Sequence, residues 1–376
     1  RMFASTDSFS LIAVPFFIFA GDLLAKGKVS RVLVEFAESL LGMLKGGLSI
    51  VSVLAGMFFA AISGSGAATT AAVGATLIPE LKKRGYREDS AAALIAAAGT
   101  IGVVIPPSVP MVLYAVISED SVNTLFKNGF VPGVLMGVIL IAISLYQAHK
   151  FNYPKGKAFS VGNVLRTFKE AIWGILMPVI ILGGIFSGYF TPSEAAAVAV
   201  IYAIFVSFFI YRDLDFKGLV EIMKGSAKTS AVIMIIIACS GPFGWVLANY
   251  KIPEAIASGV LGISTNKYVI MFLISLIILL AGVFMETSSA IIILSPVFLP
   301  LVKAMGISTV HFGILFVVGI AIGMITPPVA INLFVASGIT GLPIERISKS
   351  VIPYLIGLII VFFMIVYVPL LIPGLM

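Results

Sequence analysis

Clusters of glycine, proline and hydroxyl residues interrupt apolar stretches of the chain, and their chemistry is suited to binding ions. One cluster is Ser63-Gly64-Ser65-Gly66-Ala67-Ala68-Thr69-Thr70, and another runs from residue 99 to residue 108 and contains Pro106 and Pro107. Consecutive prolines remove backbone donors and clash with the preceding turn, so a helix must open there. Freed carbonyls and hydroxyls can then coordinate sodium, and the amides that start the next half-helix favour a carboxylate.

Both clusters recur at one constant sequence offset, which predicts a duplicated fold. The counterparts are Glu286-Thr287-Ser288-Ser289 and residues 322–328. The same gap-free shift pairs further backbone-determining residues: Pro79 with Pro300, Lys82 with Lys303, Gly85 with Gly306, Gly102 with Gly323, Pro106 and Pro107 with Pro327 and Pro328, and Pro132 with Pro353. Glycine and proline fix backbone geometry, so their coincidence indicates shared structure more than matched leucines would.

Charge predicts that the two halves face opposite ways. The loop after Pro79 carries four basic residues, whereas its counterpart after Pro300 has only Lys303 and, nearby, His311. Positively charged loops stay in the cytoplasm, so the first loop is predicted inside and the second outside. Paired, interrupted segments in inverted halves are the best sequence indication of a transporter's binding site.

The elements that position these clusters must be membrane helices. The chain has 376 residues, 60% hydrophobic and 11% charged, against about 25% charged in soluble domains. The apolar stretches approach or exceed the roughly 20 residues that a spanning helix needs: 9–24, 48–62, 129–146, 175–189, 195–211, 231–247, 268–285 and 352–372. They are apolar on every side and do not alternate as barrel strands do. We therefore predict an all-α polytopic membrane protein.

Several classes of function are disfavoured. One cysteine, Cys239, excludes an internal disulfide, and two histidines are too few for a Cys/His metal cage. The net charge of +7 lies in short loops between apolar segments, which is a positive-inside pattern and gives no reason to expect nucleic acid. No paired aspartates, Ser/His arrangement or His-Glu-Xaa-Xaa-His motif indicates an intramembrane enzyme.

The two kinds of break predict two kinds of element. Apolar arms of roughly 15 residues beside the Ser63 cluster and beside Glu286 favour hairpins that dip to mid-membrane, and the Pro-Pro pairs favour broken helices. Gly/Ser clusters can instead be packing surfaces and prolines simple kinks, but their recurrence in register favours a site. The expected divisions are 1–47 (first span and interfacial arm), 48–128 (first hairpin and broken helix), 129–228 (scaffold helices and cytoplasmic connector), 229–267 (span and second arm), 268–340 (second hairpin and broken helix) and 341–376 (C-terminal scaffold helix).

At these motifs the sequence resembles the large membrane (permease) subunit of tripartite ATP-independent periplasmic (TRAP) transporters. The matching stretches are residues 7–9, 14–21, 62–67, 105–108, 190–197, 311–313 and 325–328. The resemblance implies an inverted-repeat elevator-type transporter that carries a small organic anion, such as sialic acid or a C4-dicarboxylate, with sodium across the bacterial inner membrane. It also implies a small four-helix membrane subunit, possibly fused, and a periplasmic substrate-binding protein, with membrane lipid around the assembly and no cofactor besides the coupling ion.

The resemblance also implies site residues. Sodium would be held at Ser63, Gly102, Ile105 and Pro107 in the first half, and at Phe284, Gly323, Thr326 and Pro328 in the second. Substrate would be held by Ser65, Gly66, Thr69, Pro106, Ser108, Thr287, Ser288, Ser289, Pro327 and Asn332. The chain departs from the family at Gly319, Glu286 and Ala330, where Asn, Asp and Gly are frequent. The family has helices upstream of Asp7-Ser8-Phe9, so an upstream segment is expected.

Three residues and two alternatives stay open at this point. Glu194 follows Thr191 in a capping-box spacing, which favours a structural role, His311 favours ordinary hydrogen bonding near the outer surface, and the role of Glu286 is undetermined. Amphipathic residues 29–44 and their counterpart 253–262 are predicted to be interfacial arms. A single-component divalent-anion/sodium symporter would need no binding protein, and a channel would show flux without coupling to a gradient.

Overall fold

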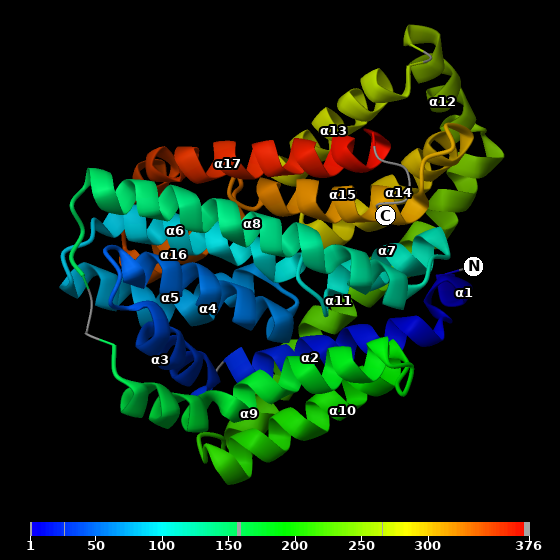
Figure 1. Cartoon of the computed structure of the whole chain (residues 1–376). Coiled ribbons are helices and arrows are strands. Elements are labelled where there is room, and N and C mark those ends of the chain that lie inside the picture. The colour runs from blue at the N-terminus through cyan, green and yellow to red at the C-terminus, as the bar shows by residue number, and fades with distance from the viewer. Residues whose placement is uncertain (1, 26, 156–158, 265, 372–376) are drawn as a thin grey trace.

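The computed structural model describes residues 2–25, 27–155, 159–264 and 266–371 (Figure 1). The first half contains Met2–Thr6 (α1), Phe9–Ile12 (η1), Ala13–Ala25 (α2), Val29–Leu41 (α3), Gly47–Ser63 (α4), Gly66–Lys83 (α5), Glu88–Thr100 (α6), Ile101–Val103 (η2), Val109–Ser118 (α7) and Val122–Lys150 (α8). Then follow Val161–Phe186 (α9), Pro192–Phe205 (α10), Val206–Ile210 (η3), Phe216–Asn249 (α11), Ile252–Ile263 (α12), Lys267–Phe284 (α13), Thr287–Ala304 (α14), Thr309–Gly323 (α15), Ile331–Thr340 (α16) and Ile344–Leu371 (α17).

The chain is helical and long helices dominate it, as the apolar stretches predict. Within the described ranges, seven helices are long and apolar enough to cross a membrane: α8, α9, α10 with η3, α11, α13, α14 and α17. The shorter apolar helices α4, α7, α15 and α16 lie beside the predicted breaks. The prediction of an all-α polytopic membrane protein is confirmed.

The sequence repeat is a repeat of elements. With the shift that pairs Pro106 with Pro327, α5 coincides with α14, and α4, α6, α7 and α8 match α13, α15, α16 and α17 to within two residues at nearly every end. Contacts between the halves are reciprocal, because α6 packs against α17 as α15 packs against α8. Neighbouring α8 and α17 run in opposite directions in Figure 1. The two halves are therefore inverted relative to each other.

The broken helices form the centre of the molecule. Nearly every residue of α6 and α15 is buried. Alanines fill most of α6 from Ala91 to Ala98, and such small side chains let helices approach closely without polar contacts. Around this centre, α8 and α17 pack mainly on α4, α6 and α15, while α2 packs on α10 and α11, and α3 on α9. Figure 1 shows α2, α9 and α10 together on one side of the bundle.

The structure also shows the local roles of Glu194 and His311. The hydroxyl of Thr191 accepts from the amide of Glu194 at 3.3 Å, and the Glu194 carboxylate accepts from the amide of Thr191 at 2.8 Å, which completes a capping box. His311 makes an ordinary hydrogen bond, since its Nε2 lies 2.9 Å from the carbonyl oxygen of Ile365. Its side chain is buried within the protein rather than at the surface.

Candidate functional site

The first hairpin is closed by small residues. Helix α4 ends at Ser63, Gly64 adopts a left-handed conformation with φ 59°, and Ser65 caps α5 by accepting from the amide of Ala68. A Cβ at Gly64 would lie 2.9 Å from the carbonyl oxygen of Pro107. Only glycine fits both the backbone conformation and this approach. The tip of the hairpin therefore rests against the first Pro-Pro break.

Oxygen atoms gather between this tip and Gly102. The Ser63 hydroxyl lies 2.9 Å from the Thr69 hydroxyl, which donates to the carbonyl of Ser65 at 2.8 Å. A Cβ placed on Gly102 would lie 2.6 Å from the Thr69 oxygen and 2.7 Å from the Ser65 carbonyl oxygen. The structure thus brings together Ser63, Ser65, Thr69 and Gly102, with the Pro107 carbonyl beside Gly64.

The first broken helix opens where the sequence predicts. A short 3-10 turn follows α6, and α7 begins only at Val109. The Ser108 hydroxyl donates to the carbonyl of Val103 at 2.5 Å and accepts from the amide of Met111, so it closes the gap and caps α7. Every residue from Ile101 to Ser108 is buried, including Ile105 and Pro106.

The second half repeats the breaks with a looser closure. Helix α15 ends at Gly323 and α16 begins at Ile331, and the Thr326 hydroxyl donates to the carbonyl of Ile322 at 2.9 Å. Pro327 and Pro328 are exposed, as is Phe284. Gly323 has a clear packing role, because a Cβ there would lie 2.1 Å from the backbone of Gly282 on α13.

Glu286 has a defined place in the second tip. Its carboxylate accepts from the amides of Ser288 and Ser289, at 2.9 and 3.1 Å, and so caps α14. A carboxylate at a helix N-terminus satisfies free amides and favours the helix dipole. Beside it, the Thr287 hydroxyl is buried and has no hydrogen-bond partner among the described residues.

The two tips meet in one cavity of about 240 Å³. Ser63, Ser65 and Gly66 line it from the first half, and Glu286, Thr287 and Ser288 from the second. The buried, unpartnered Thr287 hydroxyl is among the lining residues, so the cavity offers a hydrogen bond that the protein itself does not use.

Other predicted substrate residues lie outside this lining. Thr69 is bonded to Ser63, Ser108 caps α7, and the Ser289 amide donates to Glu286. Asn332 donates to the carbonyl of Ala96 at 3.1 Å, and its Oδ1 is buried without a partner. Pro106 is buried and Pro327 exposed.

The sequence reading missed the opposite wall of the cavity. Asp22 and Ile18 on α2 and Thr229 on α11 also line it. The Asp22 carboxylate accepts from the Ser226 hydroxyl at 2.6 Å. A lone acidic residue in the first apolar stretch was the available signal, because such residues are costly in membranes and are commonly functional.

The cavity has an unusual charge for an anion site. Among the described residues that line it, Asp22 and Glu286 are acidic and none is lysine or arginine. Glu286 is exposed at the second tip, and a substrate carboxylate beside it would be repelled unless a cation is bound with it. The cavity therefore favours an anion that binds together with a cation.

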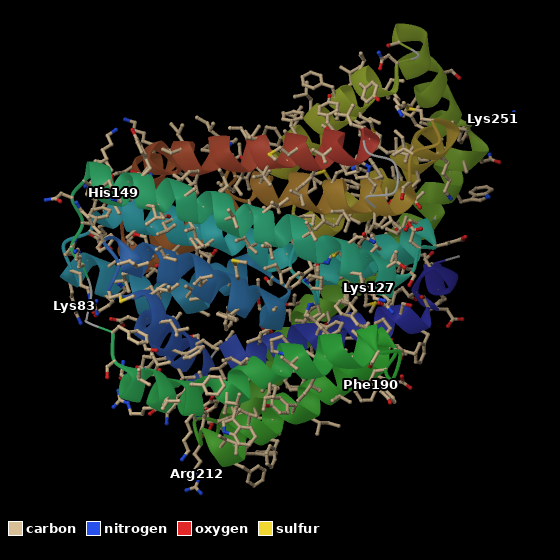
Figure 2. All side chains as sticks on the ribbon, viewed as in Figure 1. Lys83, Lys127, His149, Phe190, Arg212 and Lys251 are labelled. Atoms are coloured by element: carbon tan, nitrogen blue, oxygen red, sulfur yellow. The ribbon has the colours of Figure 1, made fainter. Side chains whose placement is uncertain are left out.

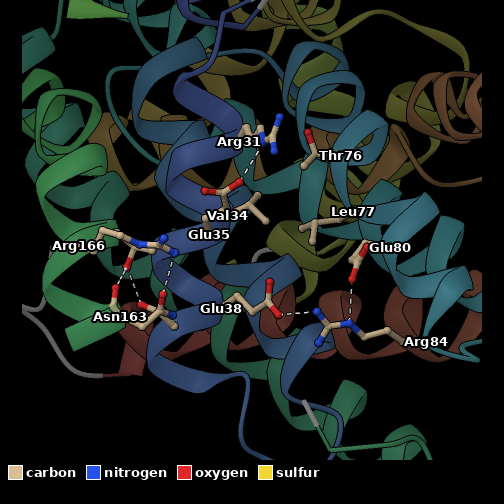
Figure 3. A pocket seen from close by; sticks show the side chains of 12 residues that line it. Arg31, Val34, Glu35, Glu38, Thr76, Leu77, Glu80, Arg84, Asn163 and Arg166 are labelled. Atoms are coloured by element: carbon tan, nitrogen blue, oxygen red, sulfur yellow. Dashed lines mark hydrogen bonds and ion pairs between the residues drawn. The ribbon is translucent and has the colours of Figure 1, made fainter. Parts of the chain in front are cut away.

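A separate charged cavity of about 390 Å³ lies between α3, α5 and α9 (Figure 3). Arg84, just beyond α5, contacts Glu38 of α3 at 2.5 Å and Glu80 at 2.9 Å. Burial lowers the pKa of the Arg84 guanidinium, but hydrogen bonds and charge from Glu38 and Glu80 outweigh it and raise the pKa overall. The ion pair joins α3 to the end of α5 that lies farthest from the hairpin tip.

The loop predicted to be cytoplasmic lies at one end of the molecule. Figure 2 places Lys83 of this loop and His149 at the left of the view, Arg212 at the lower left, and Lys127 and Lys251 toward the right. The oxygen-lined cavity lies between these ends, where the hairpin tips meet. A site away from both ends is where inverted-repeat transporters bind their cargo.

The amino-acid sequence of the chain matches one family model over almost its whole length. The model for the tripartite ATP-independent periplasmic transporter, DctM component, matches residues 1–371. The chain belongs to the DctM family. Its relatives are named as transporter permeases, and with its spans this makes it a multi-pass inner-membrane transporter subunit rather than an enzyme.

Similar members of the DctM family carry different names. The chain is 41% identical to the C4-dicarboxylate TRAP transporter large permease protein DctM of Pseudomonas aeruginosa, over 98% of this chain and 86% of that one. It is 43% identical to the isethionate TRAP transporter permease protein DctMQ of Oleidesulfovibrio alaskensis, covering 98% of this chain and 58% of that one. It is 36% identical to the sialic acid TRAP transporter large permease protein SiaM of Vibrio cholerae, over 98% and 86%.

The fold of the DctM family chain also occurs in a solved structure. The YdaH transporter of Alcanivorax borkumensis superposes with a TM-score of 0.70 at 14% identity, covering 98% of this chain and 87% of that one. At this identity the likeness concerns the fold alone.

Proposed function

We propose that this chain is the permease of a sodium-coupled uptake system for a small organic anion. The observation that carries the proposal is the cavity between the two hairpin tips, which has hydroxyls, helix starts and carboxylates but no basic residue among its described lining. Sodium bound at Ser63, Gly102 and Thr326, with backbone carbonyls, would supply the missing positive charge. Coupling then follows, because the anion binds well only when sodium is present.

The chemical class of the substrate is a small carboxylate or related organic acid. The relatives named above are described as C4-dicarboxylate, isethionate and sialic acid transporters, all of which take organic anions. A cavity of about 240 Å³ suits a small ligand. We further propose that a periplasmic binding protein delivers it and that a small four-helix membrane subunit completes the permease.

The proposed movement is a rigid shift of the hairpins and broken helices against the remaining helices. The sequence predicts α8 and α17 to be scaffold helices. Both pack mainly on α4, α6 and α15, and we propose instead that they move together with the hairpins. The Arg84 to Glu38 ion pair would be one of the contacts that this movement remakes.

Uptake into liposomes tests the proposal. The complex of this chain with its small subunit is reconstituted, and a panel of binding proteins loaded with labelled organic acids is added outside. We expect uptake only with a binding protein and an inward sodium gradient. Uptake that persists without a sodium gradient would refute the coupling, and uptake by this chain alone would instead favour a single-component symporter.

A further inference from the structure

A third cavity, of about 410 Å³, lies where α6 and α17 begin and α8 ends, and transport as proposed does not use it. Its lining is Arg87, Asp89, Ser90, Gln147, Phe151, Arg346, Lys349, Ser350 and Pro353. The end of α8 meets the start of α17 here, at the side of the molecule where Lys83 and His149 lie. The positive-inside rule assigns this side to the cytoplasmic membrane surface.

Asp89 is the only acidic residue among the described residues of this lining, and Arg87 neutralises its charge. Asp89 is buried, and its carboxylate accepts from Arg87 at 2.8 Å and from the Ser350 hydroxyl at 2.9 Å. The guanidinium of Arg87 also lies 5.1 Å from the centre of the Phe151 ring. The hydrogen bond and charge of Asp89 raise the pKa of Arg87 above its ordinary value. Arg87 is thus a fixed cation at the wall of the cavity.

The interior hydrogen bonds of the cavity are likewise satisfied. Ser90 and Tyr354 both donate to Oε1 of Gln147, at 2.9 and 3.1 Å. The polar side chains of Ser90, Gln147 and Tyr354 are therefore bonded to one another, and none of them carries a negative charge. Any net charge at this cavity must come from its rim.

The rim carries two further cations. Arg346 and Lys349 stand three residues apart in the first turns of α17, so they share a face of that helix. Both side chains are exposed, and among the described residues neither forms an ion pair with a carboxylate. Glu345, in the same first turn, is not part of the cavity lining. The lining of the cavity mouth thus has three basic residues against one acidic residue, an excess of positive charge for which the described residues provide no ion-pair partner.

An apolar stripe starts beside this mouth. Ile352, Ile356 and Ile360 follow on α17 at four-residue intervals and are 49%, 54% and 53% exposed. Residues at this spacing form one ridge along a helix. In a membrane-spanning helix such a ridge faces acyl chains. The positive mouth and the apolar ridge thus form one continuous surface.

We propose that this surface binds an anionic phospholipid, with its headgroup phosphate between Arg346, Lys349 and Arg87 and an acyl chain along the isoleucine ridge. Basic pockets between membrane helices recognise anionic headgroups by charge. A soluble phosphate would use the cations but not the ridge, and a zwitterionic lipid would use the ridge with little gain from the cations. The combination therefore favours an anionic lipid over either alternative.

Lipid titration of the purified complex tests this inference independently of transport. Binding of phosphatidylglycerol and of phosphatidylcholine to Arg346→Gln/Lys349→Gln is compared by native mass spectrometry with binding to the unaltered protein. The matched control is Lys224→Gln/Lys228→Gln, two exposed cations in the third and fourth turns of α11. Each cation near the surface changes affinity about fivefold, so the rim variant should bind phosphatidylglycerol about 30-fold more weakly. The control and phosphatidylcholine binding should change little.

Further variants separate the possible occupants. Arg346→Lys, which keeps the charge, should retain most of the affinity, and Ile356→Ser/Ile360→Ser should weaken binding of the two-chain lipid. If millimolar inorganic phosphate displaces the lipid, or if the isoleucine variant binds normally, the site is a general anion site and the proposal is wrong. Equal losses in the rim and control variants would also overturn it, since they would mean diffuse attraction to the surface. Unchanged melting in phosphatidylcholine confirms that the rim variant is folded.

Discussion

The two halves place their helices at matched positions but close their breaks differently. In the first half every residue from Ile101 to Ser108 is buried, whereas Pro327, Pro328 and Val329 in the second half are exposed. The first tip lies against its Pro-Pro break, and α4 packs along α5. In the second half α13 packs chiefly on α15 and much less on α14. Matched helix bounds therefore do not guarantee matched closure.

Side-chain volume at the tips explains the difference. Ser63-Gly64-Ser65-Gly66 in the first half corresponds to Phe284-Met285-Glu286-Thr287 in the second. The close approach at Gly64 has no room for a side chain, so the larger residues of the second tip cannot copy it. The first tip therefore packs against its break, whereas the second tip leaves its break exposed.

The comparison predicts the largest effect at Gly323. In Gly323→Ala the new Cβ would lie 2.1 Å from backbone atoms of Gly282, and a backbone cannot turn aside. Overpacking of this kind costs about 3 kcal/mol, so we expect a lower melting temperature and loss of uptake together. Thermal unfolding of the purified protein measures this. The matched control is Gly183→Ala, where a Cβ meets nothing within 4 Å.

Gly102→Ala should cost less stability than Gly323→Ala but should damage the oxygen cluster directly. Its Cβ would lie 2.6 Å from the Thr69 hydroxyl, which can rotate, and 2.7 Å from the backbone carbonyl oxygen of Ser65, which cannot, so the stability loss should be about 2 kcal/mol. Rotation of Thr69 would break its contact with Ser63 and disturb the oxygen cluster. We expect uptake per folded protein to fall about tenfold or more, with a smaller drop in melting temperature than in Gly323→Ala. Normal uptake by a folded Gly102→Ala protein would remove the cluster from the proposed site.

Hydroxyl deletions should give smaller, graded effects on sodium dependence. Ser63 lines the cavity. Ser63→Ala removes one oxygen ligand of the sodium ion and should raise the sodium concentration for half-maximal uptake about tenfold. Thr326 lies at the more exposed break and its hydroxyl is engaged by Ile322, so Thr326→Ala should raise it about threefold. Uptake is measured over a sodium series at fixed substrate. If Thr326→Ala has the larger effect, the second half holds the tighter ion.

Much of this arrangement could be predicted because backbone chemistry leaves a clear record in sequence. Paired prolines mark where α6 and α15 end, and the charge contrast between the loops after Pro79 and Pro300 indicates inversion. Hydroxyls beside helix breaks, such as Ser63 and Ser65, indicate an ion site from their chemistry, and both line the cavity. The family resemblance added Thr287 and Ser288, which also line it, and Pro327 and Ser289, which lie outside the lining.

Contacts between distant segments left no such record. Asp22 reaches the cavity because α2 packs beside α11 and α4, and nothing in the local sequence encodes that approach. The cation-rich mouth at Arg346 likewise depends on α17 starting where α8 ends. The exposure of the second break depends on side-chain volume at a tip dozens of residues earlier in the chain, which spacing alone does not report.

The smallest predicted effect lies at the start of the two short half-helices. Ser108 caps α7 from an extended conformation, whereas Ala330, one residue before α16, has φ 40° and ψ 63° and no side-chain cap. The left-handed conformation costs a residue with a Cβ about 1–2 kcal/mol, and replacement by glycine removes this cost. Glycine also makes the unfolded chain more flexible, which reduces the stabilisation by about 0.4–1 kcal/mol. Ala330 is also buried, so losing its methyl group offsets roughly 0.8 kcal/mol of this relief, and Ala330→Gly should change the free energy of unfolding by less than about 0.5 kcal/mol. Val109→Gly, at the equivalent position of the first half, should destabilise the protein by about 2–3 kcal/mol, because a larger buried side chain is lost with no strain to relieve. Thermal unfolding of both variants compares the two changes, and a loss in Ala330→Gly as large as that in Val109→Gly would mean that the left-handed conformation of Ala330 stores no strain.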